Sequence, residues 1–177
     1  EKLGATVYLI ENPVNAISST QLRRLLVFQC GKPFLPKGVE SFIVENGLYG
    51  VKKDYRNLPI DALEQVVVGL LKPNRVAHVL GCRDMAIRLA QRWGEDETNA
   101  ARAGLLHDVT KALDGPLQLT LCREYGIVLD GFSKENPKTL HALTGSLVAE
   151  RIFGEKREVV EAIRSHTTGK SDMSTLD

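Results

Sequence analysis

The pattern of apolar and polar positions divides the chain into a short first part with one strand-like run and a longer part with helical periodicity. Residues 6–10 (Thr-Val-Tyr-Leu-Ile) are rich in β-branched and aromatic side chains, which predicts a short strand. Hydroxyl residues at 18–20 precede Gln-Leu-Arg-Arg-Leu-Leu, which predicts a helix N-terminus. Because one strand is not stable alone, we interpret this segment as the last βα unit of a larger sheet that begins before this chain.

From residue 58 onward the apolar positions recur at the spacing of an α-helix. One stripe consists of Val76, Val79, Leu80, Ile87 and Ala90, on a helix that ends near Trp93 and Gly94. Further helices are predicted at about 61–71, 97–107, 115–125, 138–153 and 156–166, each with a Gly, Pro or acidic signal at one end. The fold class is therefore predicted to be mainly α, a helical bundle preceded by a short βα remnant of an α/β fold.

A change in composition near residue 57 predicts a boundary between two parts. Breakers at Gly31, Pro33 and Pro36 interrupt the first part, and a short apolar stretch at 42–44 ends in Glu-Asn-Gly, a helix-ending signal. The polar segment 52–57 is typical of a linker. We assign residues 1–57 to the remnant with its linker and residues 58–177 to the helical domain.

Composition and charge exclude several classes of protein. The 177 residues are 43% hydrophobic and 25% charged, which is typical of a globular domain. A net charge of +1 and 6% aromatic residues disfavour a nucleic-acid partner, and no apolar run approaches the roughly 20 residues of a membrane span. Three widely spaced cysteines argue against a disulfide framework and a zinc ribbon. We expect a cytoplasmic protein with no membrane partner.

The candidate chemistry lies in the histidines, all of which are in the helical part. They are His78, His107, His141 and His166, and Asp108 follows His107 directly. Imidazoles and a carboxylate are suitable ligands for divalent transition metals, and a carboxylate can bridge two ions. Small residues before His107 allow another helix to approach closely. Each histidine alone is also explained as a hydrogen-bonded core or surface residue, so the spacing leaves both interpretations open.

Four segments resemble, in order, the motifs of the HD-domain metal-dependent phosphohydrolases, and most closely their YqeK branch. They are 75–81 (Arg-Val-Ala-His-Val-Leu-Gly), 103–111 (Ala-Gly-Leu-Leu-His-Asp-Val-Thr-Lys), 140–145 (Leu-His-Ala-Leu-Thr-Gly) and 163–169 (Ile-Arg-Ser-His-Thr-Thr-Gly). The resemblance spans about residues 60–177. It implies an HD-domain helical bundle and the symmetrical hydrolysis of diadenosine tetraphosphate to two ADP.

The resemblance also implies a set of metal ligands. His78, His107 and Asp108 would hold one divalent ion, and Asp108, His141 and His166 a second, with Asp108 as the bridge. Iron is the expected metal, and manganese, cobalt and nickel also suit a histidine-rich site. The family has a further aspartate in an Ala-Asp-Tyr-Ile-Glu type motif that we do not find here, so we expect the HD domain to be C-terminally incomplete.

Cationic and hydroxyl side chains near these ligands are candidates for phosphate binding. Two metal ions about 3.5–4 Å apart can activate water and neutralise phosphoryl oxygens, which suits a polyphosphate anhydride. Lys111 lies one turn after Asp108, and these two are the predicted catalytic residues. A helix-end lysine stabilised by the dipole explains Lys111 equally well. The predicted substrate-binding residues are Arg75, Lys111, Thr167, Thr168, Gly169 and Lys170. A surface arginine at a helix start is the alternative for Arg75, and an ordinary helix C-cap is the alternative for residues 167–170.

The first fifty residues resemble the C-terminal end of nicotinate-nucleotide adenylyltransferases, on segments 17–23 and 44–50. The resemblance implies a phosphate site for ATP at a helix N-terminus. An ordinary N-cap is the alternative. The His-x-Gly-His nucleotide motif of that family is absent, so we do not expect this chain to make a dinucleotide by itself. The predicted nucleotide-binding residues here are Ser18, Ser19, Thr20 and Arg23.

Three hypotheses for the function follow. The leading one is metal-dependent hydrolysis of a nucleoside polyphosphate, in particular diadenosine tetraphosphate. The second is that nicotinate-nucleotide adenylyltransferase, in NAD biosynthesis, is the main activity of a parent fusion protein. The third is a non-catalytic metal- or nucleotide-binding HD module. A small-molecule nucleotide is the expected partner, and a homodimer is considered.

Overall fold

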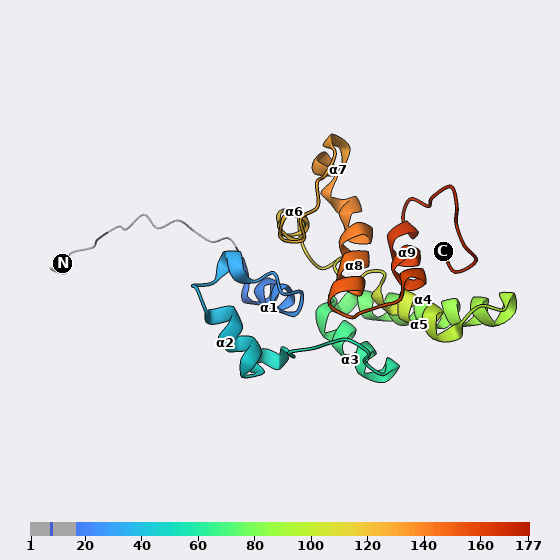
Figure 1. The fold of residues 1–177 in the computed structure, drawn as a ribbon, viewed down its shortest axis with the longest axis horizontal. Helices are drawn as coiled ribbons and strands as arrows, with labels where there is room; N and C mark the ends of the chain where they lie inside the picture. The colour runs from blue at the N-terminus through green and yellow to red at the C-terminus, as the bar shows by residue number, and fades with distance from the viewer. Residues whose placement is uncertain (1–7, 9–16) are drawn as a thin grey trace, which may run out of the picture.

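The computed structural model describes Tyr8 and residues 17–177 (Figure 1). Within them, all regular secondary structure is helical, which confirms the mainly α prediction. The strand predicted at 6–10 lies outside the described residues except for Tyr8. The α-helices are α1 (Ser19–Val27), α2 (Val39–Glu45), α3 (Ile60–Leu70), α4 (Pro73–Trp93), α5 (Glu97–Leu106), α6 (Gly115–Glu124), α7 (Gly131–Glu135), α8 (Leu140–Arg151) and α9 (Arg157–Ser165); the 3-10 turns are η1 (Lys32–Phe34), η2 (Leu48–Gly50) and η3 (Pro137–Thr139).

The helices predicted from the periodicity beyond residue 58 are all present, with ends that differ by a few residues. The helix predicted at 138–153 begins as the turn η3 and continues as α8. The short helix α7 was not predicted. It spans only Gly131–Glu135 behind the N-cap Asp130, which is too short for an apolar repeat to be visible in the sequence.

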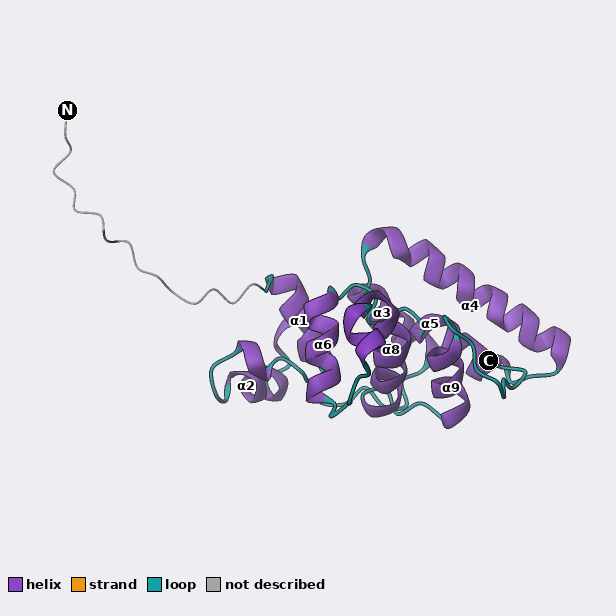
Figure 2. Ribbon diagram, turned by 90° about the horizontal axis from the view of Figure 1, so that it is seen from above, coloured by secondary structure: helices purple, strands orange, loops and turns teal. Residues whose placement is uncertain are grey.

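Helices α4 and α5 pack side by side, and α9 packs against both α5 and α8 (Figures 1 and 2). Gly104 permits the close approach of α4 to α5, because a Cβ atom at this position would lie 2.7 Å from the Cα of Arg83. The core between these helices is apolar. Its fully buried members include Leu63, Val67, Leu105, Leu106, Val148, Phe153 and Ile163.

Helix α1 contributes to the same core as the helices beyond residue 58. Leu25 and Phe28 are completely buried and belong to the cluster that contains the side chains of α3, α5 and α8. The Arg24 guanidinium donates hydrogen bonds to the carbonyls of Leu70 and Leu71. The boundary predicted at residue 57 therefore separates segments that share one core. No helix among the described residues is both long and apolar enough to cross a bilayer.

Candidate metal centre

The four histidines and Asp108 line a single cavity of about 450 Å³. His78 comes from the first half of α4, and His107 is the residue at which α5 ends. His141 lies in the first turn of α8, and His166 is the C-cap of α9. The cavity therefore forms where the ends of three helices meet the side of a fourth, and the packing left open by the sequence does bring the predicted ligands together.

Asp108 lies between two pairs of histidines. Its Oδ2 atom is 3.7 Å from Nε2 of His78 and 3.6 Å from Nε2 of His107. Its Oδ1 atom is 3.5 Å from Nε2 of His141, which in turn is 3.2 Å from Nε2 of His166. Oδ2 thus lies beside one pair of imidazoles and Oδ1 beside His141, and ligand atoms of Asp108, His141 and His166 lie within 4.8 Å of one another, which is an arrangement that suits a bridging ligand.

Backbone carbonyls orient three of the four imidazoles. The Nδ1 atoms of His107, His141 and His166 lie 2.7, 2.9 and 2.6 Å from the carbonyl oxygens of the residues three positions earlier. Because a carbonyl can only accept, each Nδ1 carries the proton and donates it there. The Nε2 atoms therefore carry the lone pairs, and those of His107 and His141 lie 3.6 and 3.5 Å from Asp108. A ring whose other nitrogen donates to a carbonyl in this way is oriented as metal-ligating histidines are.

Burial and neighbouring charges favour the protonation state that a metal requires at His107, His141 and Asp108. Burial lowers the pKa of His107 and of His141 and so favours neutral imidazoles. Burial alone would raise the pKa of Asp108, but the hydrogen bond from Arg75 and the neighbouring positive charges hold that pKa below its usual value. His107 and His141 therefore offer neutral nitrogen donors beside an ionised carboxylate.

Cationic side chains contact the same donor atoms. The Arg75 guanidinium is hydrogen-bonded to Oδ2 of Asp108, and its buried Nε has no hydrogen-bond partner among the residues that the structure describes. Nζ of Lys111 lies 2.9 Å from Nε2 of His141. The atoms predicted to bind metal ions therefore already attract the cationic groups of Arg75 and Lys111. A set of imidazole nitrogens and carboxylate oxygens with this preference fits divalent cations.

The predicted substrate-binding residues divide between two neighbouring cavities. Arg75, Lys111 and Thr167 line the cavity of the histidines. Thr168, Gly169 and Lys170 line an adjacent cavity, which Thr167 also borders. The Nζ of Lys170 is 2.7 Å from the carboxylate of Asp177 and is held by this ion pair.

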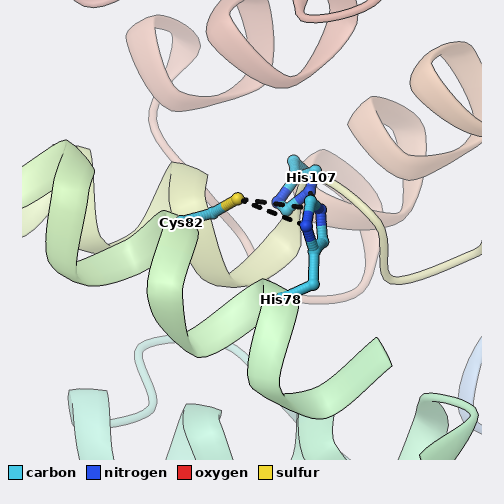
Figure 3. Close-up of side chains that lie close together, drawn as sticks. All are labelled: His78, Cys82 and His107. Atoms are coloured by element: carbon cyan, nitrogen blue, oxygen red, sulfur yellow. Dashed lines mark hydrogen bonds between the residues drawn. The ribbon is translucent and has the colours of Figure 1, made fainter. Parts of the chain in front are cut away.

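The structure adds one donor that the sequence analysis did not assign. The Cys82 thiol lies 3.6 Å from Nε2 of His78, and it belongs with His78 and His107 to one group of potential metal ligands (Figure 3). Burial is the main cause that raises the pKa of this thiol. The signal that would have found it is the spacing His-x-x-x-Cys, which places both side chains on one face of a helix.

The residues predicted for a nucleotide site in the first part lie at the start of α1. Ser18 is its N-cap and accepts a hydrogen bond from the backbone N–H of Gln21, so the ordinary capping role is present. Ser19 is the first residue of the helix. Thr20 and Arg23 line a separate cavity of about 410 Å³, in which the Arg23 guanidinium lies over the ring of Tyr49.

Fold and site together define a class of protein, an α-helical bundle whose helix ends bring histidines and an aspartate into a donor set for divalent metal ions. The HD domain family model matches residues 75–177. This match covers more than half of the chain, and the chain therefore belongs to the HD domain family. The HD-domain prediction made from the four motifs is confirmed.

The chain is similar to two bacterial proteins named symmetrical bis(5'-nucleosyl)-tetraphosphatase. It is 35% identical to that of Halalkalibacterium halodurans over 64% of this chain and 60% of the relative, and 32% identical to that of Bacillus subtilis over 60% and 58%. It thus spans about three fifths of the length of these relatives. The solved structure of a predicted HD superfamily hydrolase involved in NAD metabolism, from Clostridium acetobutylicum, matches with a TM-score of 0.64 and 35% identity, over 67% of this chain and 64% of that one.

Proposed function

We propose that this protein is a metal-dependent phosphohydrolase that cleaves diadenosine tetraphosphate symmetrically to two ADP. The observation that carries the proposal is the position of Asp108. Its Oδ2 lies 3.6 to 3.7 Å from Nε2 of His78 and His107, its Oδ1 lies 3.5 Å from Nε2 of His141, and ligand atoms of Asp108, His141 and His166 lie within 4.8 Å of one another. The similarity to proteins named symmetrical tetraphosphatase supports the choice of substrate. Three free cysteines in the described residues support a reducing, cytoplasmic location.

The proposed ligands are those that the cavity brings together. His78, His107 and Asp108 would hold one ion, and Asp108, His141 and His166 the other. When bound, two such ions polarise phosphoryl oxygens and lower the pKa of water. Imidazole-rich donor sets suit iron, which we propose, as well as manganese, cobalt and nickel.

The chain itself supplies positive charge and a shaped cavity. We assign Arg75 and Lys111, whose cationic groups lie beside Asp108 and His141, to neutralise the non-bridging oxygens of the polyphosphate. Thr167 borders both cavities and can donate a hydrogen bond to a phosphate that spans them. In the reaction, the oxygen of one water joins a central phosphorus, the central bridging P–O bond breaks, and the two water protons end on the two ADP products or in solvent.

Product analysis tests this proposal. The purified chain, loaded with ferrous or manganous ions, is incubated with diadenosine tetraphosphate, and the nucleotides are separated by chromatography. We expect ADP as the sole product. ATP and AMP in equal amounts would contradict symmetrical cleavage, and metal binding without any product would favour the alternative of a non-catalytic HD module.

The cavity beside α1 supports a second proposal for the first part of the chain. Thr20, Arg23 and Lys52 supply a hydroxyl and two cations, and Tyr49 supplies an aromatic face. We propose that residues 1–57 are the remnant, with linker, of a nicotinate-nucleotide adenylyltransferase-like domain. The test compares the ATP affinity of the wild type and of an Arg23→Ala variant. Loss of ATP binding in the variant, with metal binding unchanged, would support this assignment, and an unchanged ATP affinity would oppose it.

A homodimer also remains a proposal. Met85, Leu89 and Trp93 follow one another at intervals of four residues on α4, and their side chains are exposed. A second copy of this chain that packs α4 against α4 would cover them. Sedimentation equilibrium of the wild type and of a Leu89→Glu variant tests this: we expect a dimer that the substitution dissociates, and a monomeric wild type would refute it.

A further inference from the structure

We propose that Cys82 is a thiolate ligand at the position formed by His78, His107 and Asp108, which makes this position a mixed nitrogen, oxygen and sulfur site for a borderline-soft divalent cation. The inference rests on the proposed function only in that both need a metal ion at this position. It adds a ligand and a metal preference that the histidines and Asp108 alone do not specify.

The thiol reaches the site because of its place on α4. Cys82 follows His78 by four residues, so both side chains project from the same face of the helix. Figure 3 shows the Cys82 side chain directed toward the imidazoles of His78 and His107. Donor atoms of these three residues all lie within 4.8 Å of one another.

The separations agree with those in a tetrahedral shell. Bond lengths of about 2.3 Å to sulfur and about 2.0–2.1 Å to nitrogen require ligand atoms about 3.6 Å apart for sulfur and nitrogen and about 3.3 Å apart for two nitrogens. The distances here are 3.6 Å from Sγ of Cys82 to Nε2 of His78 and 3.2 Å from that Nε2 to Nε2 of His107. Two of the three separations therefore match those that one ion requires, and the third, between Sγ of Cys82 and the His107 ring, is within 4.8 Å.

The surroundings of Cys82 distinguish it from the other two cysteines. Cys30 and Cys122 are buried, whereas Cys82 is partly exposed and lines the cavity. Among the described residues, the polar contacts of its sulfur are with the His78 ring. A thiolate donor favours cobalt, zinc and ferrous ions over magnesium and manganese. The thiol proton leaves to solvent as the metal–sulfur bond forms.

Cobalt absorption spectroscopy tests the proposal without reference to turnover. The 177-residue chain is stripped of metal and titrated with Co²⁺ alone, and the near-ultraviolet band of thiolate-to-cobalt charge transfer is recorded. We expect the band in the wild type and its loss in Cys82→Ser, together with a fall of at least about tenfold in Co²⁺ affinity. The matched control is Cys122→Ala, which removes a cysteine outside the cavity and should keep the band. Circular dichroism checks that each variant is folded.

The remaining outcomes separate this proposal from the proposed function. If the wild type binds Co²⁺ without the charge-transfer band and Cys82→Ser binds it equally well, Cys82 is not a ligand, and the histidine and aspartate centre stands. If the wild type binds no Co²⁺, the metal centre itself is wrong and both proposals fail. A variant Cys82→Asp that regains affinity with a preference moved toward Mn²⁺ would support the ligand position independently.

Discussion

At the scale of single residues, the site depends on a carboxylate in the protein interior. Asp108 is 1% exposed, and a buried charge without partners would be costly. Arg75 compensates this charge on one oxygen, and histidine nitrogens surround both oxygens. The histidines that help to stabilise the buried carboxylate of Asp108 are also the residues with which it would form both proposed metal positions.

Replacing Asp108 with asparagine keeps the side-chain shape and removes its charge. We expect Asp108→Asn to lose hydrolysis by roughly a thousandfold, equivalent to about 4 kcal/mol of transition-state stabilisation, because both ions lose their shared ligand. Initial rates with diadenosine tetraphosphate measure this. Asp61→Asn, at an exposed carboxylate in α3, is the control and should retain the wild-type rate. Equal rates in the two variants would remove Asp108 from the mechanism.

The lowered pKa values of His107 and His141 give the metal-free protein a pH-dependent stability. The unfolded chain takes up protons on histidine near its ordinary pKa of about 6.5, whereas the folded chain does so only at lower pH. The contribution of these two histidines to the free energy of unfolding is therefore fully present above about pH 6.5, and it is lost as the pH drops below that value. Urea unfolding with a chelator present, at a series of pH values, measures this. A His107→Gln and His141→Gln double variant should show a weaker fall below about pH 6.5; an unchanged slope would contradict the assignment.

At the scale of helices, the site is built from helix ends whose relative positions are fixed by contacts between their side chains.

The candidate ligand residues could largely be predicted from the sequence, because the His and His-Asp motifs and the helix boundaries are local signals. The contacts of Arg75 with Asp108 and of Lys111 with His141 could not be predicted, since they join residues about thirty positions apart. The spacing of Cys82 from His78 on α4 is a local signal that the sequence analysis did not use, whereas its position beside His107 depends on how closely α4 approaches α5.

That approach can be tested at Gly104. A Cβ atom there would lie 2.7 Å from the Cα and 3.0 Å from the backbone nitrogen of Arg83, which are backbone atoms that cannot move alone. We expect Gly104→Ala to lower the free energy of unfolding by about 1–3 kcal/mol. Gly81→Ala, on α4 itself and with no atom of the described residues within 4 Å of the new Cβ, should instead raise it by up to about 1 kcal/mol. Chemical denaturation compares the two, and changes of the same sign would show that helix separation is not the cause.

At the scale of the whole molecule, the segment before residue 58 is part of the folded core. The sequence signals a change of composition there, but composition does not report which side chains meet across a linker. The buried Phe28 and the hydrogen bond from the Tyr125 hydroxyl to its carbonyl are long-range contacts that only the folded chain reveals. The strand proposed for residues 6–10 stays a prediction.

Truncation of one phenylalanine tests this shared core. We expect Phe28→Ala to lower the free energy of unfolding by about 3–5 kcal/mol in a single cooperative transition. The control is Phe42→Ala in α2, whose side chain is 60% exposed and should contribute little. Two separate unfolding transitions in the wild type, with Phe28→Ala affecting only one of them, would instead show that the two segments fold independently.

The central claim is that Asp108 joins two metal positions in one cavity. Elemental analysis of the purified chain after loading with ferrous ions and desalting tests it most directly. We expect about two ions per wild-type chain and fewer than one in Asp108→Asn, because both positions share this ligand. Two ions retained in Asp108→Asn, or none in the wild type, would contradict the account.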